Sequence, residues 1–198
     1  MIAGIFLAAG KSRRFGSCKL LHKIDGVPLV RLSLERCLES SLPTVHVVVD
    51  ANNPAVEEEI NRFTGEDRRV RIIRNDYSER GQMSSVKLGL ASVDAKSAAA
   101  MIVLGDMPLV THDVIDGLLS SFDRRPGITI PKCHGRFYHP RIIPRRYFPE
   151  FLRLGDDAKG TDVIDRYHDD VMAVEIDSRR AFLDIDDPSD VLKLKIAE

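Results

Sequence analysis

Apolar runs alternate with amphipathic stretches throughout residues 1–125, and this alternation constrains the fold more than any other feature of the chain. Nearly continuous apolar runs at 2–8, 44–50 and 98–104 are typical of strands buried on both faces of a sheet, and 70–74 predicts a shorter strand. The stretches between them carry apolar residues at helical spacing. Such alternation favours parallel βαβ units with right-handed crossovers. We therefore expect a three-layer α/β sandwich with a mostly parallel sheet.

Local signals predict where further elements begin. Asn53-Pro54, followed by three glutamates, predicts a helix whose first amides are capped by the Asn53 side chain, and Thr111 is a predicted cap for another helix. The later strands are expected near 127–131, 141–143 and 171–176, and the later helices near 145–154, near 161–167 and from Asp187 onward. Because no repeat, low-complexity segment or linker interrupts the pattern, residues 1–198 are expected to form a single domain.

Composition excludes several classes of protein. With 43% hydrophobic and 30% charged residues the chain is an ordinary globular one, and its net charge of −1 argues against a nucleic-acid partner. The three cysteines, Cys18, Cys37 and Cys133, have no metal-type spacing and suggest no disulfide framework. No apolar run approaches the length needed to span a bilayer, and the apolar start is unlike a signal peptide. A cytoplasmic location without membrane contact is expected.

The loop after the first strand has the chemistry of a phosphate-binding loop. In open parallel sheets, ligands gather at the carboxyl ends of the strands, where this loop lies. Small residues let the backbone approach an anion closely, and basic residues supply positive charge. The small residues are Ala8, Ala9, Gly10 and Gly16, and the basic residues are Lys11, Arg13, Arg14 and Lys19.

Two familiar phosphate motifs do not fit this loop. Five residues separate Gly10 from Gly16, whereas a P-loop has four followed by Lys-Ser/Thr, and here Ser17-Cys18 follows. A dinucleotide fingerprint needs a middle glycine where this chain has Ser12, which disfavours a nicotinamide-dependent oxidoreductase.

The segment from Leu7 to Leu21 resembles the opening signature of the MobA-like nucleotidyltransferases, especially their molybdenum cofactor cytidylyltransferase branch. Four further segments resemble that family in order: Arg80 to Leu90, Leu104 to Pro108, His139-Pro140, and Leu183 to Asp190. The resemblance covers nearly the whole chain and implies the Rossmann-like fold of nucleotide-diphospho-sugar transferases. It departs at Tyr138, where the family pattern has glycine before His139, and this departure predicts an acceptor pocket that differs in shape from that of a molybdopterin enzyme.

The resemblance also implies roles for individual residues. Nucleotide binding is implied for Leu7, Ala8, Ala9, Gly10, Ser12, Arg14, Lys19, Gln82, Ser84 and Ser85. Arg14, Lys19 and Asp106 are the implied catalytic residues, with Asp106 as a Mg²⁺ ligand. Asp184 or Asp186 is implied as a second metal ligand, and His139, Asp184 and Asp186 as acceptor-binding residues. An acidic lead-in to the closing helix would explain the two aspartates equally well, and a helix cap would explain the segment at Gln82.

The function that these features favour is transfer of a nucleoside monophosphate, with Mg²⁺, from a nucleoside triphosphate to a phosphorylated small molecule. The form Ala8-Ala9-Gly10 leans towards CMP from CTP and molybdopterin as acceptor. Guanylyl transfer and another phosphorylated metabolite are the close alternatives. A non-catalytic accessory protein that delivers a cofactor to a molybdoenzyme is the alternative of a different class, and a transient contact with a molybdoenzyme is an implied partnership.

Overall fold

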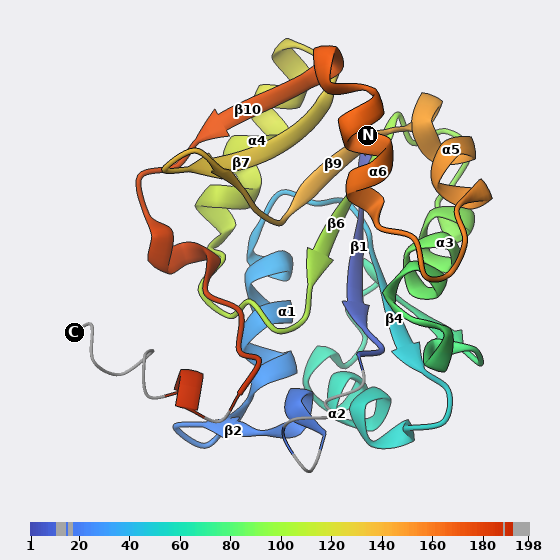
Figure 1. The fold of residues 1–198 in the computed structure, drawn as a ribbon. Coiled ribbons are helices and arrows are strands. Elements are labelled where there is room, and N and C mark those ends of the chain that lie inside the picture. The colour runs from blue at the N-terminus through green and yellow to red at the C-terminus, as the bar shows by residue number, and fades with distance from the viewer. Residues whose placement is uncertain (11–14, 16–17, 188, 192–198) are drawn as a thin grey trace.

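The computed structural model describes residues 1–10, 15, 18–187 and 189–191. In this part of the chain an eight-stranded sheet has the order β10-β7-β9-β6-β1-β4-β5, with β8 paired to β7, and β2 and β3 form a separate hairpin (Figure 1). The strands are β1 (Ile2–Ala8), β2 (Lys23–Ile24), β3 (Val27–Pro28), β4 (Val45–Asp50), β5 (Val70–Asn75), β6 (Ala99–Leu104), β7 (Ile128–Cys133), β8 (Arg136–Phe137), β9 (Arg141–Pro144) and β10 (Val171–Glu175). The α-helices are α1 (Leu29–Glu39), α2 (Pro54–Thr64), α3 (Gln82–Ser92), α4 (His112–Arg124), α5 (Phe148–Arg153) and α6 (Gly160–Arg166).

The first half of the chain forms the parallel part of the sheet. Strand β1 pairs in parallel with β4 on one side and with β6 on the other, and β4 pairs in parallel with β5. All seven residues of β1 are buried, as expected of a strand covered on both faces. The predicted mostly parallel α/β sheet is therefore confirmed.

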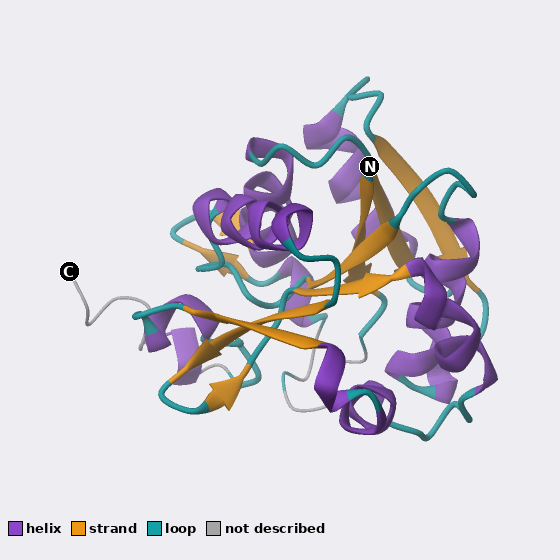
Figure 2. Cartoon of the chain, turned by 90° about the horizontal axis from the view of Figure 1, so that it is seen from above, coloured by secondary structure: helices purple, strands orange, loops and turns teal. Residues whose placement is uncertain are grey.

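Helices cover both faces of this sheet, so the fold has three layers (Figure 2). One apolar core lies under α1, α2 and α4 and contains Phe6, Leu34 and Ile115. The other lies under α3, α5 and α6 and contains Ile5 and Phe151. Because neighbouring residues of a strand point to opposite faces, Ile5 and Phe6 serve different cores.

The second half of the chain adds antiparallel pairing. Strand β9 lies between β6 and β7 and is antiparallel to both, whereas β10 is parallel to β7. An antiparallel neighbour begins where the adjacent strand ends. The first residue of β9, Arg141, therefore lies beside Ile102 in the carboxyl-terminal half of β6, near the edge where ligands gather in parallel sheets.

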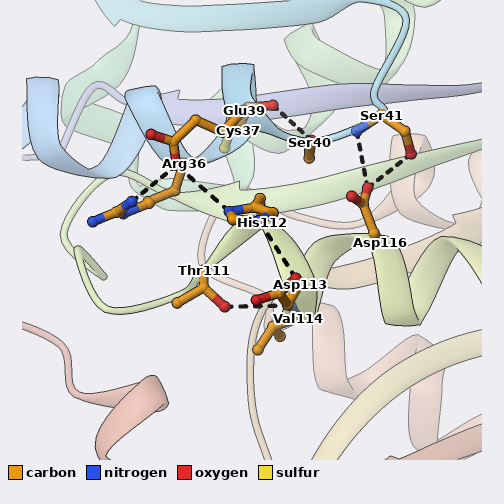
Figure 3. Close-up of polar contacts among 10 residues, drawn as sticks. All are labelled: Arg36, Cys37, Glu39, Ser40, Ser41, Thr111, His112, Asp113, Val114 and Asp116. Atoms are coloured by element: carbon orange, nitrogen blue, oxygen red, sulfur yellow. Dashed lines mark hydrogen bonds and ion pairs between the residues drawn. The ribbon is translucent and has the colours of Figure 1, made fainter.

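Polar contacts join the end of α1 to α4 beneath one face of the sheet (Figure 3). The Ser41 backbone N–H and hydroxyl both donate to Asp116 Oδ1, at 2.9 and 2.7 Å. The predicted cap of α4 is confirmed, because the Thr111 hydroxyl accepts from the backbone N–H of Val114 at 3.5 Å. These contacts hold α4 against the end of α1 and cap its first turn.

Some sequence expectations need correction. Helix α2 begins at Pro54 as predicted, but the Asn53 side chain makes no capping hydrogen bond, because its Nδ2 turns away and lies 3.4 Å from Cys18 Sγ. The short hairpin of β2 and β3 was not predicted. The helix expected from Asp187 onward falls largely outside the described residues. Among the described residues, no helix combines the length and apolar character that crossing a membrane requires.

Candidate active site

The turn after β6 meets the end of β1 at the carboxyl edge of the sheet. The Gly105 N–H donates to the Leu7 carbonyl oxygen at 3.0 Å, which continues the β1–β6 ladder past Leu104. A Cβ atom at position 105 would lie 2.8 Å from that oxygen, so only glycine permits the close approach. Asp106 follows directly, and its side chain is thereby placed above the end of β1.

Lys19 joins two acidic segments at this edge. It lies in the short 3-10 helix η1 (Lys19–Leu21), and its Nζ lies 2.9 Å from Asp106 Oδ2 and 2.8 Å from Asp186 Oδ1. The Ile185 N–H donates to the Asp106 backbone carbonyl at 3.0 Å, which holds the closing segment in place. Burial opposes the charge on Lys19, but the carboxylates of Asp106 and Asp186 outweigh it and raise its pKa.

The carboxylate of Asp106 is the candidate metal ligand at this edge of the sheet. Its Oδ1 atom is buried and has no hydrogen-bond partner among the described residues, although Oδ2 receives Lys19. A buried carboxylate oxygen without a partner is costly unless a ligand satisfies it. The described residues contain no cluster of three or more protein ligands for a metal. That combination fits Mg²⁺, which commonly takes one or two carboxylates and completes its shell with water and phosphate oxygens.

Asp184 lies beside this cluster without joining Lys19. Burial, and then the negative charges of Asp186 and Asp106, raise the pKa of its carboxyl group. Tyr138 helps to position the segment, because its ring stacks on Phe182 with the ring centroids 4.6 Å apart. The tyrosine that departs from the family pattern thus packs against the chain just before the aspartates.

A pocket of about 300 Å³ opens above these residues. Its floor is formed by the end of β1, and its walls by the start of α3 on one side and by the Lys19–Asp106 pair on the other. The predicted residues that line it are Leu7, Ala9, Gly10, Lys19, Gln82, Ser85 and Asp106. The pocket therefore brings together the strand-one loop, the start of α3 and the turn after β6, which lie far apart in the sequence.

Buried Asn75, at the carboxyl end of β5, orients the serines of α3. Its Nδ2 donates to Ser84 Oγ at 3.0 Å and to Ser85 Oγ at 2.9 Å. Ser84 Oγ in turn donates to the Gly81 carbonyl at 2.7 Å, and Ser84 does not line the pocket. Ser85 is therefore held at the pocket wall by a residue that the sequence analysis missed, although the place of Asn75 at a strand end could have signalled it.

A second pocket of about 470 Å³ adjoins the first and shares Leu7, Gly81 and Gln82 with it. It lies on the face of the sheet covered by α3, α5 and α6, and its lining includes His139 and Arg141. Its volume is within the usual range for small-molecule pockets. The two pockets together offer adjoining places for two small ligands.

His139 is an uncharged donor and acceptor in the second pocket. Burial, followed by the positive charge of Arg141, lowers its pKa to about 3. Its Nδ1 lies 3.4 Å from the Ile102 carbonyl oxygen, which can only accept, so this contact assigns the proton to Nδ1. Nε2 is then a hydrogen-bond acceptor at neutral pH.

The structure separates some residues that the sequence analysis grouped. His139 lines the second pocket, whereas Asp186 binds Lys19 beside the first, and Asp184 lines neither. Ala8 is buried in the core under α1 and does not line the first pocket. Ser12 and Arg14 lie outside the described residues. Lys159, which also lines the second pocket, was missed, and no local sequence pattern marks it.

Comparison with known proteins identifies the family. Residues 4–171 match the MobA-like NTP transferase domain. A probable molybdenum cofactor guanylyltransferase of Thermococcus sibiricus is 28% identical over 76% of this chain and 71% of its own length, and one of Pyrococcus furiosus is 28% identical over 98% and 97%. The crystal structure of Rv0371c from Mycobacterium tuberculosis H37Rv has the same fold, with a TM-score of 0.82, 21% identity and coverage of 100% of this chain and 99% of that one. The chain belongs to the MobA-like NTP transferase domain family and is a nucleotidyltransferase.

Proposed function

We propose that this protein transfers a nucleoside monophosphate from a nucleoside triphosphate to the phosphate of a small-molecule acceptor and releases pyrophosphate. The observation that carries the proposal is the meeting of Lys19, Asp106 and Asp186 at the mouth of the first pocket, directly above the end of β1. A cation between two carboxylates beside a glycine-containing loop suits the binding and charge neutralisation of a triphosphate.

We assign the nucleotide to the first pocket. The backbone at Ala9 and Gly10 would approach the phosphates, while Gln82 and Ser85 would contact the ribose and base. Arg14, on the resemblance of its motif, would fork across phosphate oxygens. Asp106 and Asp186 would hold Mg²⁺, and the ion, when bound, would neutralise charge on the phosphate oxygens.

The reaction needs positioning rather than a protein nucleophile. An oxygen of the acceptor phosphate forms a bond to the α-phosphorus, and the bond from that phosphorus to the bridging α–β oxygen breaks, so the electron pair leaves with pyrophosphate. Lys19 acts as a point charge that stabilises the departing pyrophosphate. The second pocket, which shares a wall with the first, is assigned to the acceptor.

CTP and molybdopterin are the leading substrates in this proposal, because the resemblance associates the Ala8-Ala9-Gly10 form of the loop with cytidylyl transfer. Guanylyl transfer is the second candidate, since two relatives of this chain are named probable molybdenum cofactor guanylyltransferases. A transient contact with a molybdoenzyme and a cytoplasmic location stay predictions.

Pyrophosphate release tests the proposal. The protein is incubated with Mg²⁺ and each of CTP, GTP, ATP and UTP, with and without purified molybdopterin or other phosphorylated acceptors. We expect acceptor-dependent release with CTP, or with GTP if the second candidate holds, and a reduction of at least about 10²-fold in Asp106→Asn, by analogy with the loss of one transition-state contact. Asp113→Asn is the matched control, because Asp113 is an exposed aspartate in the first turn of α4. Nucleotide binding without turnover, unchanged in Asp106→Asn, would instead support a cofactor-delivery protein.

A further inference from the structure

The lining of the second pocket includes a positively charged side chain, Arg141, that has no role in the proposed nucleotide chemistry. Arg141 is partly buried at the start of β9, and its Cα pairs with that of Ile102, so both side chains belong to the face under α3 and α6. Antiparallel pairing of β9 with β6 brings this arginine towards the carboxyl edge of the sheet, near the first pocket. A parallel strand in the same place would begin at the opposite edge.

No acidic side chain neutralises Arg141 at short range. Its Nε donates to the Tyr138 carbonyl at 3.0 Å, and no carboxylate in the described part of the chain lies within 4.0 Å of its guanidinium nitrogens. The charge of Asp165 acts on it from further away. Removing a guanidinium from water without an ion-pair partner is costly, so a buried arginine of this kind calls for a bound anion or another functional reason.

Two acidic residues line the pocket, Asp156 and the exposed Asp157, and among the described residues neither forms an ion pair with Arg141. Asp156 accepts from Lys87 Nζ at 2.8 Å and lies 3.9 Å from the Arg80 guanidinium. Lys159, at the exposed start of α6, adds a further positive charge to the lining, and His139 is neutral there. The pocket therefore presents Arg141 as its inner cation and Lys159 as its outer one.

We infer that Arg141, with Lys159 at the rim, binds an oxyanion of the acceptor in the second pocket. A guanidinium with unused N–H groups suits a phosphate or carboxylate held by two parallel hydrogen bonds. Arg141 is thus a specificity-determining residue that selects an anionic acceptor and places it next to the nucleotide. That the anion belongs to an acceptor substrate rests on the proposed function. Binding of the anion can nevertheless be measured without turnover.

Inorganic phosphate is the probe, and it is titrated into a solution of the 198-residue protein with Mg²⁺ and a saturating α,β-methylene analogue of CTP or GTP. The analogues occupy the first pocket, so the added phosphate reports on the second. Binding is followed by calorimetry and by the phosphate-dependent shift in melting temperature. We expect Arg141→Leu to weaken phosphate binding at least about tenfold, because a charge-assisted bidentate contact is lost. Its affinity for the nucleotide analogue should stay unchanged.

A stability measurement separates binding from a structural role. Because Arg141 is an unneutralised cation in the unliganded protein, Arg141→Leu should melt at the same or a higher temperature than the wild type without phosphate. Arg136→Leu is the matched control, since it removes one exposed arginine from β8, outside both pockets. Arg141→Lys should retain part of the phosphate affinity, and Lys159→Met should weaken it less than Arg141→Leu does.

Phosphate affinity in Arg141→Leu equal to that of Arg136→Leu would overturn the inference. If Arg141→Leu does not fold, unchanged phosphate affinity in both Arg141→Lys and Lys159→Met would overturn it. Failure of the proposed function is a separate result: absence of pyrophosphate release with every triphosphate, together with Arg141-dependent phosphate binding, would reject nucleotidyl transfer and retain the anion site.

Discussion

Lys19→Met removes the ammonium group that two carboxylates share. We expect this substitution to increase the stabilisation of the protein by Mg²⁺ and to decrease turnover. In the wild type the Lys19 side chain is 12% exposed and lies within 2.9 Å of both Asp106 and Asp186. Methionine keeps a similar length without the charge. The two carboxylates would then repel each other without compensation until a divalent cation binds.

The expected loss of unfolding free energy follows from the charges that Lys19 faces and from how far each pair is buried. Two unit charges about 4 Å apart interact by about 4 kcal/mol at an effective dielectric constant near 20, and desolvation of the ammonium offsets part of that gain. The Asp186 side chain is 51% exposed, so its pair with Lys19 contributes little, within the roughly 0–1 kcal/mol of surface pairs. We expect the variant to lose about 2 kcal/mol of unfolding free energy in metal-free buffer, or roughly 4–8 °C in melting temperature.

Thermal unfolding with and without Mg²⁺ at constant ionic strength measures the effect. Mg²⁺ should stabilise Lys19→Met more than the wild type, in which the ion must displace an ammonium group. Turnover should fall by about 10²–10³-fold, because the charge that faces pyrophosphate is lost. Lys23→Met, at an exposed position of β2, is the matched control. Equal stabilisation of both proteins by Mg²⁺ would refute competition between Lys19 and the ion, and unchanged turnover would refute its role on pyrophosphate.

Three further predictions concern stability. Gly89→Ala in α3 should lower the unfolding free energy in urea by about 1–3 kcal/mol, because the added methyl group would overlap Ile5 Cγ2. Gly117→Ala in α4 is the control and should be neutral or stabilising, because no atom lies within 4 Å of the added methyl group. Equal effects of the two substitutions would contradict this. The pKa of His139 falls from 6.5 to about 3 on folding, so the unfolded chain binds the extra proton and stability drops below pH 6.5, by up to about 1.4 kcal/mol per pH unit. His139→Gln should lose less stability than the wild type between pH 7 and 5, and parallel pH profiles would refute the burial argument. Thr111→Ala should cost about 1 kcal/mol in the same assay through loss of the α4 cap, and an unchanged midpoint would contradict that.

Short-range patterns predicted most of the elements in the first half of the chain. The apolar run of β1, the Pro54 start of α2 and the Thr111 cap of α4 each depend on neighbouring residues, which the sequence displays directly. The pairing of β9 could not be predicted in this way, because a four-residue strand carries no signal for its neighbour or its direction. That residues 1–198 form one domain stays a prediction.

The sequence by itself indicated the family and predicted which segments meet at the first pocket. The carboxyl ends of parallel strands lie at one edge of a sheet. The small and basic residues after the first strand and the aspartate after a later buried strand therefore belong at the same edge. On this reasoning Lys19 and Asp106 could be placed together in advance. The distance of 2.9 Å between Lys19 Nζ and Asp106 Oδ2 agrees with that reasoning.

Only the tertiary structure decided which distant residues share a pocket. Asp186, rather than Asp184, binds Lys19, and the backbone between these two aspartates is held by the hydrogen bond from the Ile185 N–H to the Asp106 carbonyl oxygen. Arg141 lies near the nucleotide pocket because β9 runs antiparallel to β6, and Lys159 lies on the same pocket because α6 packs over that face. Such placements depend on strand direction and helix packing between segments far apart in the chain, and no local pattern of residues encodes them.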